Sequence, residues 1–277
     1  MTKVRLFRAD PQGLVELPTS ARTLREATLA LPQGAYTTMR TYGGDRFLRL
    51  EAHLDRLERS ARLLGYNGPL DRQEARRALA AAVARAGFPE SRLRLIWTFA
   101  RPHQLYVAIE PFAPYPSSLY EEGVACTTVP LQRQHPRAKT TAFIAPSRRV
   151  YEQLPPGIHE ALRVGPAGEL LEGLTSNFFA LREGVLYTAG AQVLEGITRA
   201  IVLELARPLL PVRLRPIRRE ELDTLDEAFI TSSSREVMPV VRIDDTPIGE
   251  GKPGPVTQEL LARYRRLVER EARPALP

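Results

Sequence analysis

Apolar and polar positions alternate over several short segments in the first part of the chain, and elsewhere apolar residues recur every three to four positions. Alternation is typical of strands, and the longer period is typical of helices. The pattern predicts helices at residues 51–65 and 72–87, and strands at residues 3–9, 34–43, 46–50, 92–100 and 104–112. Blocks of strands with helices in a block of their own indicate an α+β domain.

The stretch PFAPYPSSLYEEG, residues 111–123, contains three prolines and follows the last of these strands. Proline fixes the backbone and interrupts regular structure, so this composition predicts a linker. We therefore expect an N-terminal domain over residues 1–112, a linker over residues 113–123 and a C-terminal domain over residues 124–277.

Strand patterns predominate in the region after the linker. They predict strands at residues 123–131, 177–188, 211–217, 227–233 and 239–249. Helices are expected at residues 198–206, 218–225 and 255–272. The sequence thus predicts a two-domain α+β protein, in which a smaller α/β domain precedes a larger, mostly β domain with helices at its edges.

The composition is that of a globular protein. The 277 residues are 43% hydrophobic and 26% charged, close to the average for soluble domains. No apolar run approaches the roughly 20 residues that span a bilayer, and the first residues lack the features of a signal peptide. We therefore expect a cytoplasmic protein with no membrane partner.

The net charge of +7 comes largely from arginines that alternate with glutamates along predicted helices, as in RYRRLVEREARP. This interleaving is typical of a solvated helix face with ion pairs, and no nucleic-acid-binding motif accompanies it. The charge therefore favours anionic small molecules over nucleic acids as partners. Cys126 is the single cysteine, which excludes an intrachain disulfide and a cysteine zinc cluster, and its strand-like surroundings favour a buried structural thiol.

Lysine is rare in this chain. Only three of the 39 basic residues are lysines, and one of them, Lys139, lies in the stretch HPRAKTTAF. A lysine amine can lose its proton and attack a carbonyl, whereas arginine stays charged. Lys139 is therefore either a reactive group or an ordinary surface charge, and the local sequence leaves both interpretations open.

Two stretches have the composition of an anion-binding site. In LEGITRAIVLELA, Gly196 and Thr198 stand at the start of a predicted amphipathic helix, where backbone N–H groups have no partner within the helix. In FITSSSREVMPV, small hydroxyl residues that include Ser233 follow a predicted strand. The alternatives are an ordinary helix cap for the first stretch and an ordinary polar turn for the second.

Two further stretches hold candidate polar groups. In ELLEGLTSNFFAL, Glu172 and Asn177 lie around a glycine turn before an apolar strand, so the carboxylate is either a turn acceptor or part of a site. In HLDRLERSA, His53 and Arg56 are one turn apart on one helix face. The alternative for this pair is an exposed helix surface.

In combination and in this order, HLDRL, KTTAF, EGLTSNFF, LEGITR and FITSSSREVMPVVRID resemble the fold-type IV family of pyridoxal-phosphate enzymes. That family includes the class IV aminotransferases of branched-chain and D-amino acids, and also aminodeoxychorismate lyase. The resemblance runs from GAYTTMRTYGG to IGEGKPGPVT, nearly the whole chain. It implies the two-domain α+β fold of this family, pyridoxal 5′-phosphate as the cofactor and a homodimer.

The resemblance also implies roles for the matched residues. Lys139 would form a Schiff base with the cofactor aldehyde and then serve as acid and base. Glu172 would face the pyridine nitrogen and keep it protonated, which strengthens the cofactor as an electron sink. The phosphate would bind, by this resemblance, to Arg56, Ile197, Thr198 and Ser233.

Two features place the chain nearest to the D-amino acid aminotransferase and lyase branches. Branched-chain members often have an asparagine and a tyrosine shortly after the lysine, whereas this chain has Ala142, Phe143 and Ile144. The stretch EGLTSN is also more similar to the other two branches.

The resemblance extends to the substrate side. Tyr36 in GAYTTMR matches a tyrosine of the D-amino acid aminotransferase pocket, and Arg101 and His103 resemble the pair that holds the substrate carboxylate. The alternative for this pair is a solvent-exposed hairpin turn. Arg40 either approaches the same pocket or points outward from its strand.

We therefore expect a transaminase that moves an amino group between an amino acid and a 2-oxo acid, with D-amino acids among the candidate donors. The alternative is aminodeoxychorismate lyase, which releases pyruvate and 4-aminobenzoate. Both would use the same cofactor residues, so the sequence does not separate them.

Overall fold

The computed structural model describes residues 4–100 and 104–276, and the chain divides into two compact units. The first unit contains the chain up to Pro114, the segment Arg137–Pro146 and the chain from Val268 onward. The second unit contains Tyr115–Pro136 and Ser147–Leu267. This division differs from the expected one, because two later segments join the first unit and the expected linker, from residue 115 on, joins the second.

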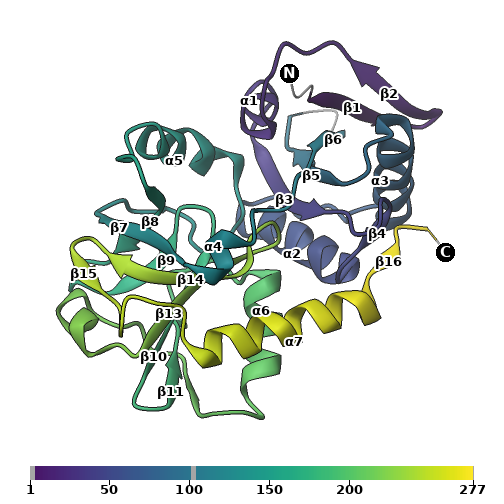
Figure 1. Ribbon diagram of the computed structural model, residues 1–277. Coiled ribbons are helices and arrows are strands. Elements are labelled where there is room, and N and C mark those ends of the chain that lie inside the picture. The colour runs from purple at the N-terminus through teal and green to yellow at the C-terminus, as the bar shows by residue number, and fades with distance from the viewer. Residues whose placement is uncertain (1–3, 101–103, 277) are drawn as a thin grey trace. The chain divides into compact units, whose positions relative to one another are not determined.

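An antiparallel sheet with the strand order β2-β1-β6-β5-β3 forms the centre of the first unit (Figure 1). Its strands are β1 (Arg5–Asp10), β2 (Gly13–Leu17), β3 (Gly34–Arg40), β5 (Ser91–Thr98) and β6 (Gln104–Pro111). The helices of this unit include α1 (Leu24–Leu29), α2 (Leu50–Leu63) and α3 (Arg72–Ala86). The strand β3 lies at one edge of the sheet, which leaves one side of it available for pairing.

Both faces of this sheet are buried. Leu93 and Leu95 of β5 belong to one apolar cluster together with Leu54 and Leu57 of α2. Ile96 of the same strand belongs to a second cluster that includes residues of α1. Because successive side chains of a strand point to opposite faces, one strand supplies both clusters. Each fully buried leucine contributes about 1.5–3 kcal/mol to folding.

The ends of the two long helices follow from single residues. Helix α3 begins after Asp71, whose side chain accepts a hydrogen bond from the Glu74 amide, and ends at Gly87, which has a φ of 65°. Helix α2 begins after Arg49, which has a left-handed φ of 51°. This turn of the backbone interrupts the expected strand at residues 46–50 and leaves only β4 (Arg46–Phe47).

Two later segments join the first unit through backbone pairing. The short strand β16 (Arg273–Pro274) pairs with β4. The 3₁₀ turn η1 (Thr141–Phe143) follows Thr140, which forms a bridge with Ala35 at the free edge of β3. Composition alone does not predict that a later segment joins an earlier unit, because these contacts involve backbone atoms, which every residue has.

The second unit is built on a sheet that closes on itself. The strand order β10-β13-β14-β7-β8-β9 returns to β10 through the pair Glu172 and Asn177. These strands are β7 (Val124–Val129), β8 (Ile158–Val164), β9 (Leu170–Gly173), β10 (Asn177–Arg182), β13 (Glu227–Ser232) and β14 (Glu236–Ile243). Three short strands extend the sheet, namely β11 (Val185–Tyr187), β12 (Val212–Arg213) and β15 (Thr246–Pro247). The expected mostly β second domain is therefore confirmed.

Helices lie around this closed sheet, some at the expected ranges and two, at residues 118–121 and 144–151, where none was expected. They are α4 (Ser118–Glu121), α5 (Ile144–Tyr151), α6 (Ile197–Ala206), the 3₁₀ helix η2 (Arg219–Thr224) and α7 (Pro255–Glu271). Pro146 in α5 lies in the first turn, where a missing N–H group costs little. The start of α7 receives its cap from the sheet, because Glu227 of β13 accepts hydrogen bonds from the amides of Val256 and Thr257.

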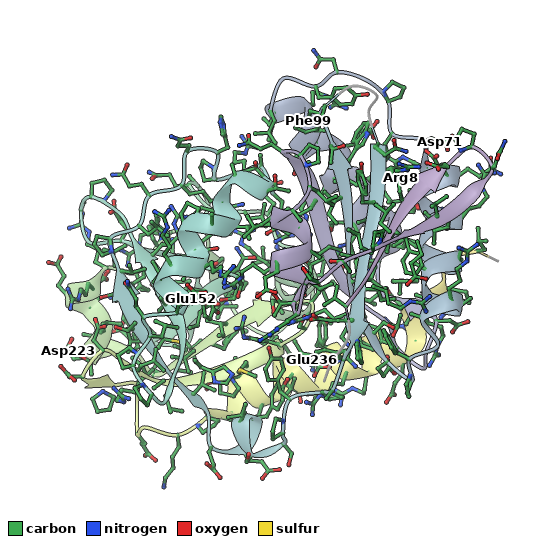
Figure 2. The ribbon with its side chains drawn as sticks, turned by 90° about the horizontal axis from the view of Figure 1, so that it is seen from above. Arg8, Asp71, Phe99, Glu152, Asp223 and Glu236 are labelled. Carbon is green, nitrogen blue, oxygen red and sulfur yellow. The ribbon has the colours of Figure 1, made fainter. Side chains whose placement is uncertain are left out.

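The surface agrees with the expected ion-paired arrangement of charges. Asp71, Glu152 and Asp223, all labelled in Figure 2, are exposed. On α7, Arg263 pairs with Glu259 one turn earlier at 2.6 Å. Across residues 4–100 and 104–276, the helices are too short or too polar to cross a membrane. Inside the second unit, Cys126 is completely buried, as expected, and burial raises the pKa of its thiol.

Candidate active site

Lys139 lies on a backbone that is fixed from two sides within the first unit. Its carbonyl accepts a hydrogen bond from the Tyr36 amide at 3.0 Å, which pairs it with the edge strand β3. Its own amide donates to the hydroxyl of Ser60 on α2, also at 3.0 Å. Lys139 is therefore a partly buried residue at a defined position, and the interpretation as a loose surface charge does not apply.

The amine of Lys139 lies close to an aromatic ring that also contacts a second cationic side chain. Its Nζ is 4.9 Å from the centroid of the Tyr36 ring, and the guanidinium of Arg94 lies 4.8 Å from the same centroid. Burial lowers the pKa of Arg94. A cation near the face of an aromatic ring is attracted by its electrons, so Tyr36 offers an attractive surface to both groups.

Arg56 of α2 is held by a buried hydroxyl of β3. Its Nη2 donates to Thr37 Oγ1 at 2.9 Å, and the same oxygen lies 2.8 Å from His53 Nδ1. All three side chains are buried. Burial, together with the positive charges of Arg56 and then Lys139, lowers the pKa of His53 well below its usual value. The alternative interpretation of His53 and Arg56 as an exposed helix surface therefore does not apply.

Arg40 is buried between aromatic rings, near the end of β3. Its guanidinium lies 4.4 Å from the ring centroid of Tyr42 and 4.6 Å from that of Phe112, and its Nε donates to the Thr41 carbonyl. Residues four apart on a strand share a face, so Arg40 is on the same side of β3 as Tyr36. Arg101 and His103, the expected carboxylate pair, lie outside the described residues.

Glu172 is a buried carboxylate in the second unit, with hydrogen-bond donors at both oxygens. Oε1 accepts from Arg133 at 3.0 Å and from Arg163 at 2.9 Å. Oε2 accepts from the Leu194 amide at 2.9 Å and is 3.4 Å from the amide nitrogen of Asn177. Glu172 also lies in the strand pair that closes the sheet. Its orientation is thus fixed both by the backbone and by four donors.

The start of α6 lies next to this carboxylate. Asn177 donates to the carbonyl of Leu194, two residues before Gly196, which is the N-cap of the helix. A Cβ on Gly196 would come within 2.1 Å of Asn177 Oδ1, so only glycine fits there. Ile197 and Thr198 form the buried first turn, whose backbone N–H groups have no partner within the helix. These groups and the helix dipole favour an anion.

The turn between β13 and β14 carries Ser233, the remaining expected phosphate ligand. Thr231, just before this turn, is paired in the sheet with Asn177, which places the turn near the start of β10. The Thr231 side chain is buried, and within the described part of the chain its Oγ1 has no hydrogen-bond partner. The structure therefore brings Glu172, Ile197, Thr198 and Ser233 into one region of the second unit, and it brings Tyr36, Arg40, Arg56 and Lys139 into one region of the first.

Several polar residues at these two regions were not expected from the sequence. Arg133 and Arg163 contact Glu172, and Thr37 contacts Arg56. In a chain where 36 of 39 basic residues are arginines, a buried arginine has no distinguishing signal. For Thr37 a signal was available. The alternation of side chains along its strand places Thr37 inward, and a polar residue at an inward position indicates a buried polar contact.

Comparison with known proteins identifies the family. A family model described as amino-transferase class IV matches residues 34–243. The branched-chain-amino-acid aminotransferase of Pseudomonas aeruginosa is 30% identical in an alignment 263 residues long, which covers 87% of this chain and 86% of that protein. The D-alanine aminotransferase of Staphylococcus aureus is 35% identical over 101 residues, 35% of this chain and 36% of that protein.

The fold is also shared with solved structures. The crystal structure of a T.th. branched-chain amino acid aminotransferase with pyridoxamine 5′-phosphate has a TM-score of 0.82, covers 98% of both chains and is 24% identical. The expected fold-type IV architecture is thereby confirmed. The expected D-amino acid branch is supported only in part, because the D-alanine aminotransferase matches about a third of the chain. The chain belongs to the class IV amino-transferase family and is, as the resemblance implied, a pyridoxal-phosphate-dependent aminotransferase.

Proposed function

We propose that this aminotransferase moves the amino group of an amino acid to a 2-oxo acid, and that Lys139 is the residue that bonds the cofactor aldehyde. The observation that supports this most directly is the placement of Lys139. Hydrogen bonds to β3 and α2 fix its backbone, and its amine lies 4.9 Å from the Tyr36 ring centroid. An amine that must attack one carbon atom benefits from such a fixed position.

The residues fit pyridoxal 5′-phosphate in their chemistry. Thr231 Oγ1, buried without a partner in the described residues, and the first N–H groups of α6 provide donors for a phosphate. Gly196, just before these groups, packs closely against Asn177, since a Cβ there would meet the Asn177 side chain. Glu172 provides a fixed acceptor for a protonated ring nitrogen. We assign the phosphate to Arg56, Ile197, Thr198 and Ser233.

The chemistry of transfer divides between the cofactor and the chain. When bound, pyridoxal phosphate withdraws electrons from the carbon that carries the amino group, which allows that carbon to lose its proton. Lys139 Nζ accepts this proton and returns it at a second carbon, so one side chain serves as base and then as acid. Glu172, which accepts hydrogen bonds from both Arg133 and Arg163, keeps a negative charge at a fixed place for the ring nitrogen.

Two donor classes are supported by different observations. The stretch EGLTSN and the match to D-alanine aminotransferase support D-amino acids. A relative that matches 87% of the chain is named for branched-chain amino acids. For the substrate carboxylate we propose Tyr36, Arg40, Arg101 and His103, and we propose a homodimer, which sedimentation of the purified protein would test.

A donor panel without any 2-oxo acid tests this function. Each L- and D-amino acid is mixed with the holoenzyme, and the absorbance of the bound cofactor is followed. An aminotransferase completes its first half-reaction without an acceptor, so a fitting donor converts the cofactor to its amine form and yields one equivalent of 2-oxo acid. If no amino acid does so, while aminodeoxychorismate releases pyruvate, the enzyme is instead a lyase.

A further inference from the structure

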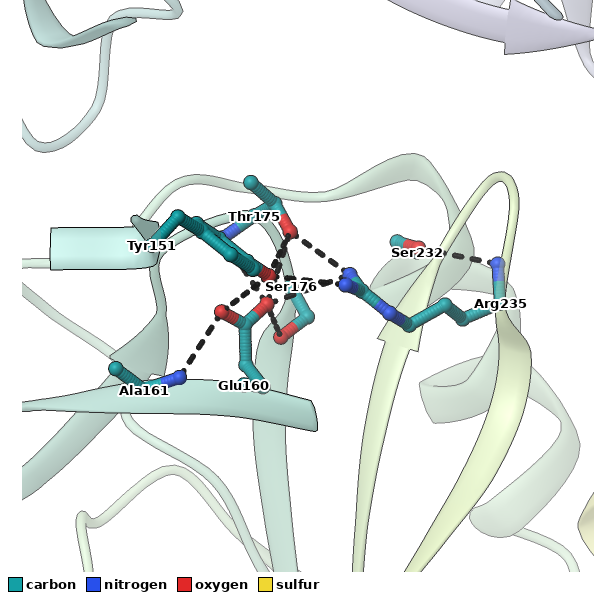
Figure 3. A network of polar contacts seen from close by, with 7 residues as sticks. All are labelled: Tyr151, Glu160, Ala161, Thr175, Ser176, Ser232 and Arg235. Carbon is teal, nitrogen blue, oxygen red and sulfur yellow. Dashed lines mark hydrogen bonds and ion pairs between the residues drawn. The ribbon is translucent and has the colours of Figure 1, made fainter. Parts of the chain in front are cut away.

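A polar network joins four segments of the second unit (Figure 3). At its centre is Glu160 of β8, which is 0% exposed. Its Oε2 accepts from the hydroxyls of Thr175 at 2.8 Å and Ser176 at 3.1 Å, and its Oε1 accepts from the hydroxyl of Tyr151 at 2.7 Å. One carboxylate therefore holds a residue of α5 and the turn that precedes β10.

Arg235 completes this network from the turn between β13 and β14. Its Nη1 donates to Thr175 Oγ1 at 2.7 Å and lies 3.3 Å from Glu160 Oε2, while its Nη2 donates to the Tyr151 hydroxyl at 2.9 Å. The Arg235 amide also donates to Ser232 Oγ at 3.1 Å. Both ends of this arginine are therefore held, the side chain by the network and the backbone by its own turn.

Two hydroxyl groups, which lie 3.2 Å apart, stand between the two charges. Tyr151 and Thr175 each donate their single hydroxyl hydrogen to Glu160 and each accept from Arg235. A hydroxyl has one hydrogen to donate, so each group bridges the two charges in one direction only. Glu160 and Arg235 are thus connected directly and through two bridging hydroxyls, which leaves little freedom in their relative position.

The network lies between the two turns that reach the proposed phosphate site. Ser233 is in the Ser232–Arg235 turn, which Arg235 anchors. Asn177 follows Ser176 and holds the carbonyl of Leu194, just before the start of α6. The turn that contains Ser176 is also closely packed, because a Cβ on Gly173 would come within 2.2 Å of Ser176 Oγ. A shift of either turn would therefore change the distance between Ser233 and the helix start.

Stability alone is a weak reason for such a pair. Removing two charges from water costs several kcal/mol per ion, and apolar replacements of buried ion pairs are often neutral or stabilising. A buried ion pair does restrict geometry, because its partners tolerate few alternative arrangements.

We propose that the Glu160–Arg235 pair positions the two turns of the phosphate site, and so gives the protein its preference for the phosphorylated form of the cofactor over pyridoxal. This inference rests on the proposed function. Glu160 and Arg235 are positioning residues in this account, since Ser233 and the start of α6 make the contacts with the phosphate.

The test measures the affinity of apo protein for pyridoxal 5′-phosphate and for pyridoxal, each by absorbance titration. Glu160→Gln and Arg235→Met should each weaken binding of the phosphorylated form by about tenfold or more, the size of one lost hydrogen bond to a charged group. Binding of pyridoxal should stay nearly constant, because it lacks the phosphate. A general loss of structure would weaken both ligands alike, so the ratio of the two affinities separates positioning from folding.

The double variant Glu160→Gln/Arg235→Met keeps the test decisive if the single variants fold poorly, because it removes both buried charges together. It should melt near the wild-type temperature and still show the reduced ratio. Arg182→Met is the matched control, since it breaks the ion pair with Glu221 at the far end of β10, and its ratio should equal that of wild type.

Two results would overturn different parts of the account. An unchanged affinity ratio in every folded variant contradicts the role of Glu160 and Arg235. A wild-type protein that bonds neither pyridoxal nor its phosphate contradicts the proposed function itself.

Discussion

Thr37 and His53 share a buried hydrogen bond of 2.8 Å between Thr37 Oγ1 and His53 Nδ1. The same oxygen accepts a hydrogen bond from Arg56 Nη2 at 2.9 Å, so one hydroxyl contacts both side chains. Burial, with the nearby charges of Arg56 and Lys139, lowers the pKa of His53 well below its usual value and so favours the neutral ring. The proposed phosphate ligand Arg56 is thus held by a hydroxyl that also contacts His53.

The neutral state of His53 predicts a loss of stability in acid. In the unfolded chain a histidine has a pKa near 6.5, whereas burial keeps the pKa of His53 in the folded protein well below that value. As the pH falls below about 6.5, the unfolded chain binds a proton that the folded chain does not, so the free energy of unfolding decreases by up to about 1.4 kcal/mol per pH unit.

His53→Asn keeps a hydrogen-bonding group near the position of Nδ1 but does not titrate in this range. Urea unfolding of both proteins across about pH 5–8 should show a smaller slope of stability against pH for the variant. Equal slopes for the two proteins would mean that His53 is protonated in the folded state as well.

Thr37→Val should impair phosphate binding more than it impairs folding. Valine has the shape of threonine but leaves Arg56 Nη2 and His53 Nδ1 without this hydroxyl, at a cost of about 1–3 kcal/mol in unfolding free energy. Arg56 then loses its fixed orientation, so the affinity for pyridoxal phosphate should fall, as measured by titration of the apo protein. Thr37→Ser keeps the hydroxyl and is the control; if it binds the cofactor as weakly as the valine variant, the hydroxyl is not the relevant feature.

The partners of Glu172 predict an order of stabilities. Glu172→Gln leaves Arg133 and Arg163 buried without their shared counter-charge, which should cost about 3–5 kcal/mol. Arg163→Met removes one of the two buried cations and leaves Glu172 paired with Arg133, so the cost should be smaller. Urea unfolding of the apo proteins measures both, and a larger loss for Arg163→Met would contradict this description of the site. Glu172→Gln should also slow the half-reaction strongly, because the ring nitrogen loses its charged partner.

Helix α7 depends on a cap supplied by the sheet. Glu227 accepts from the amides of Val256 and Thr257 at 3.0 and 2.7 Å and from the Thr257 hydroxyl at 2.7 Å. Glu227→Ala should therefore lower the free energy of unfolding by about 2 kcal/mol. Glu259→Ala removes an exposed ion pair with Arg263 on the same helix and should cost at most about 0.5 kcal/mol. Similar losses for the two variants would show that the cap contributes little.

The regular elements were largely predictable because their signals are local. The apolar period and the residues Asp71 and Gly87 define α3, which was expected at residues 72–87 and spans Arg72–Ala86. The expected strand at residues 46–50 was mostly wrong, because Arg49 adopts a left-handed φ that no local pattern indicates. Strands β8 and β9 were not expected; they pair with each other, and β8 also pairs with the more distant β7.

The site was predictable only as far as motifs extend. Lys139 differs from its arginine-rich background, and the ordered motifs identify Glu172, Thr198 and Ser233 as candidates. The buried ion pairs Arg163–Glu172 and Glu160–Arg235 join residues that are 9 and 75 positions apart in the chain. A single sequence contains no signal for such pairing.

The central claim is that Lys139 bonds the cofactor, and one measurement tests it directly. The holoenzyme is treated with borohydride, which makes the bond to the cofactor permanent, and the digested protein is then mapped by mass spectrometry. The account predicts the added mass on the peptide that contains Lys139, and its absence in Lys139→Ala. Label on Lys252 or Lys3 instead, or a protein that retains no cofactor after reduction, would contradict it.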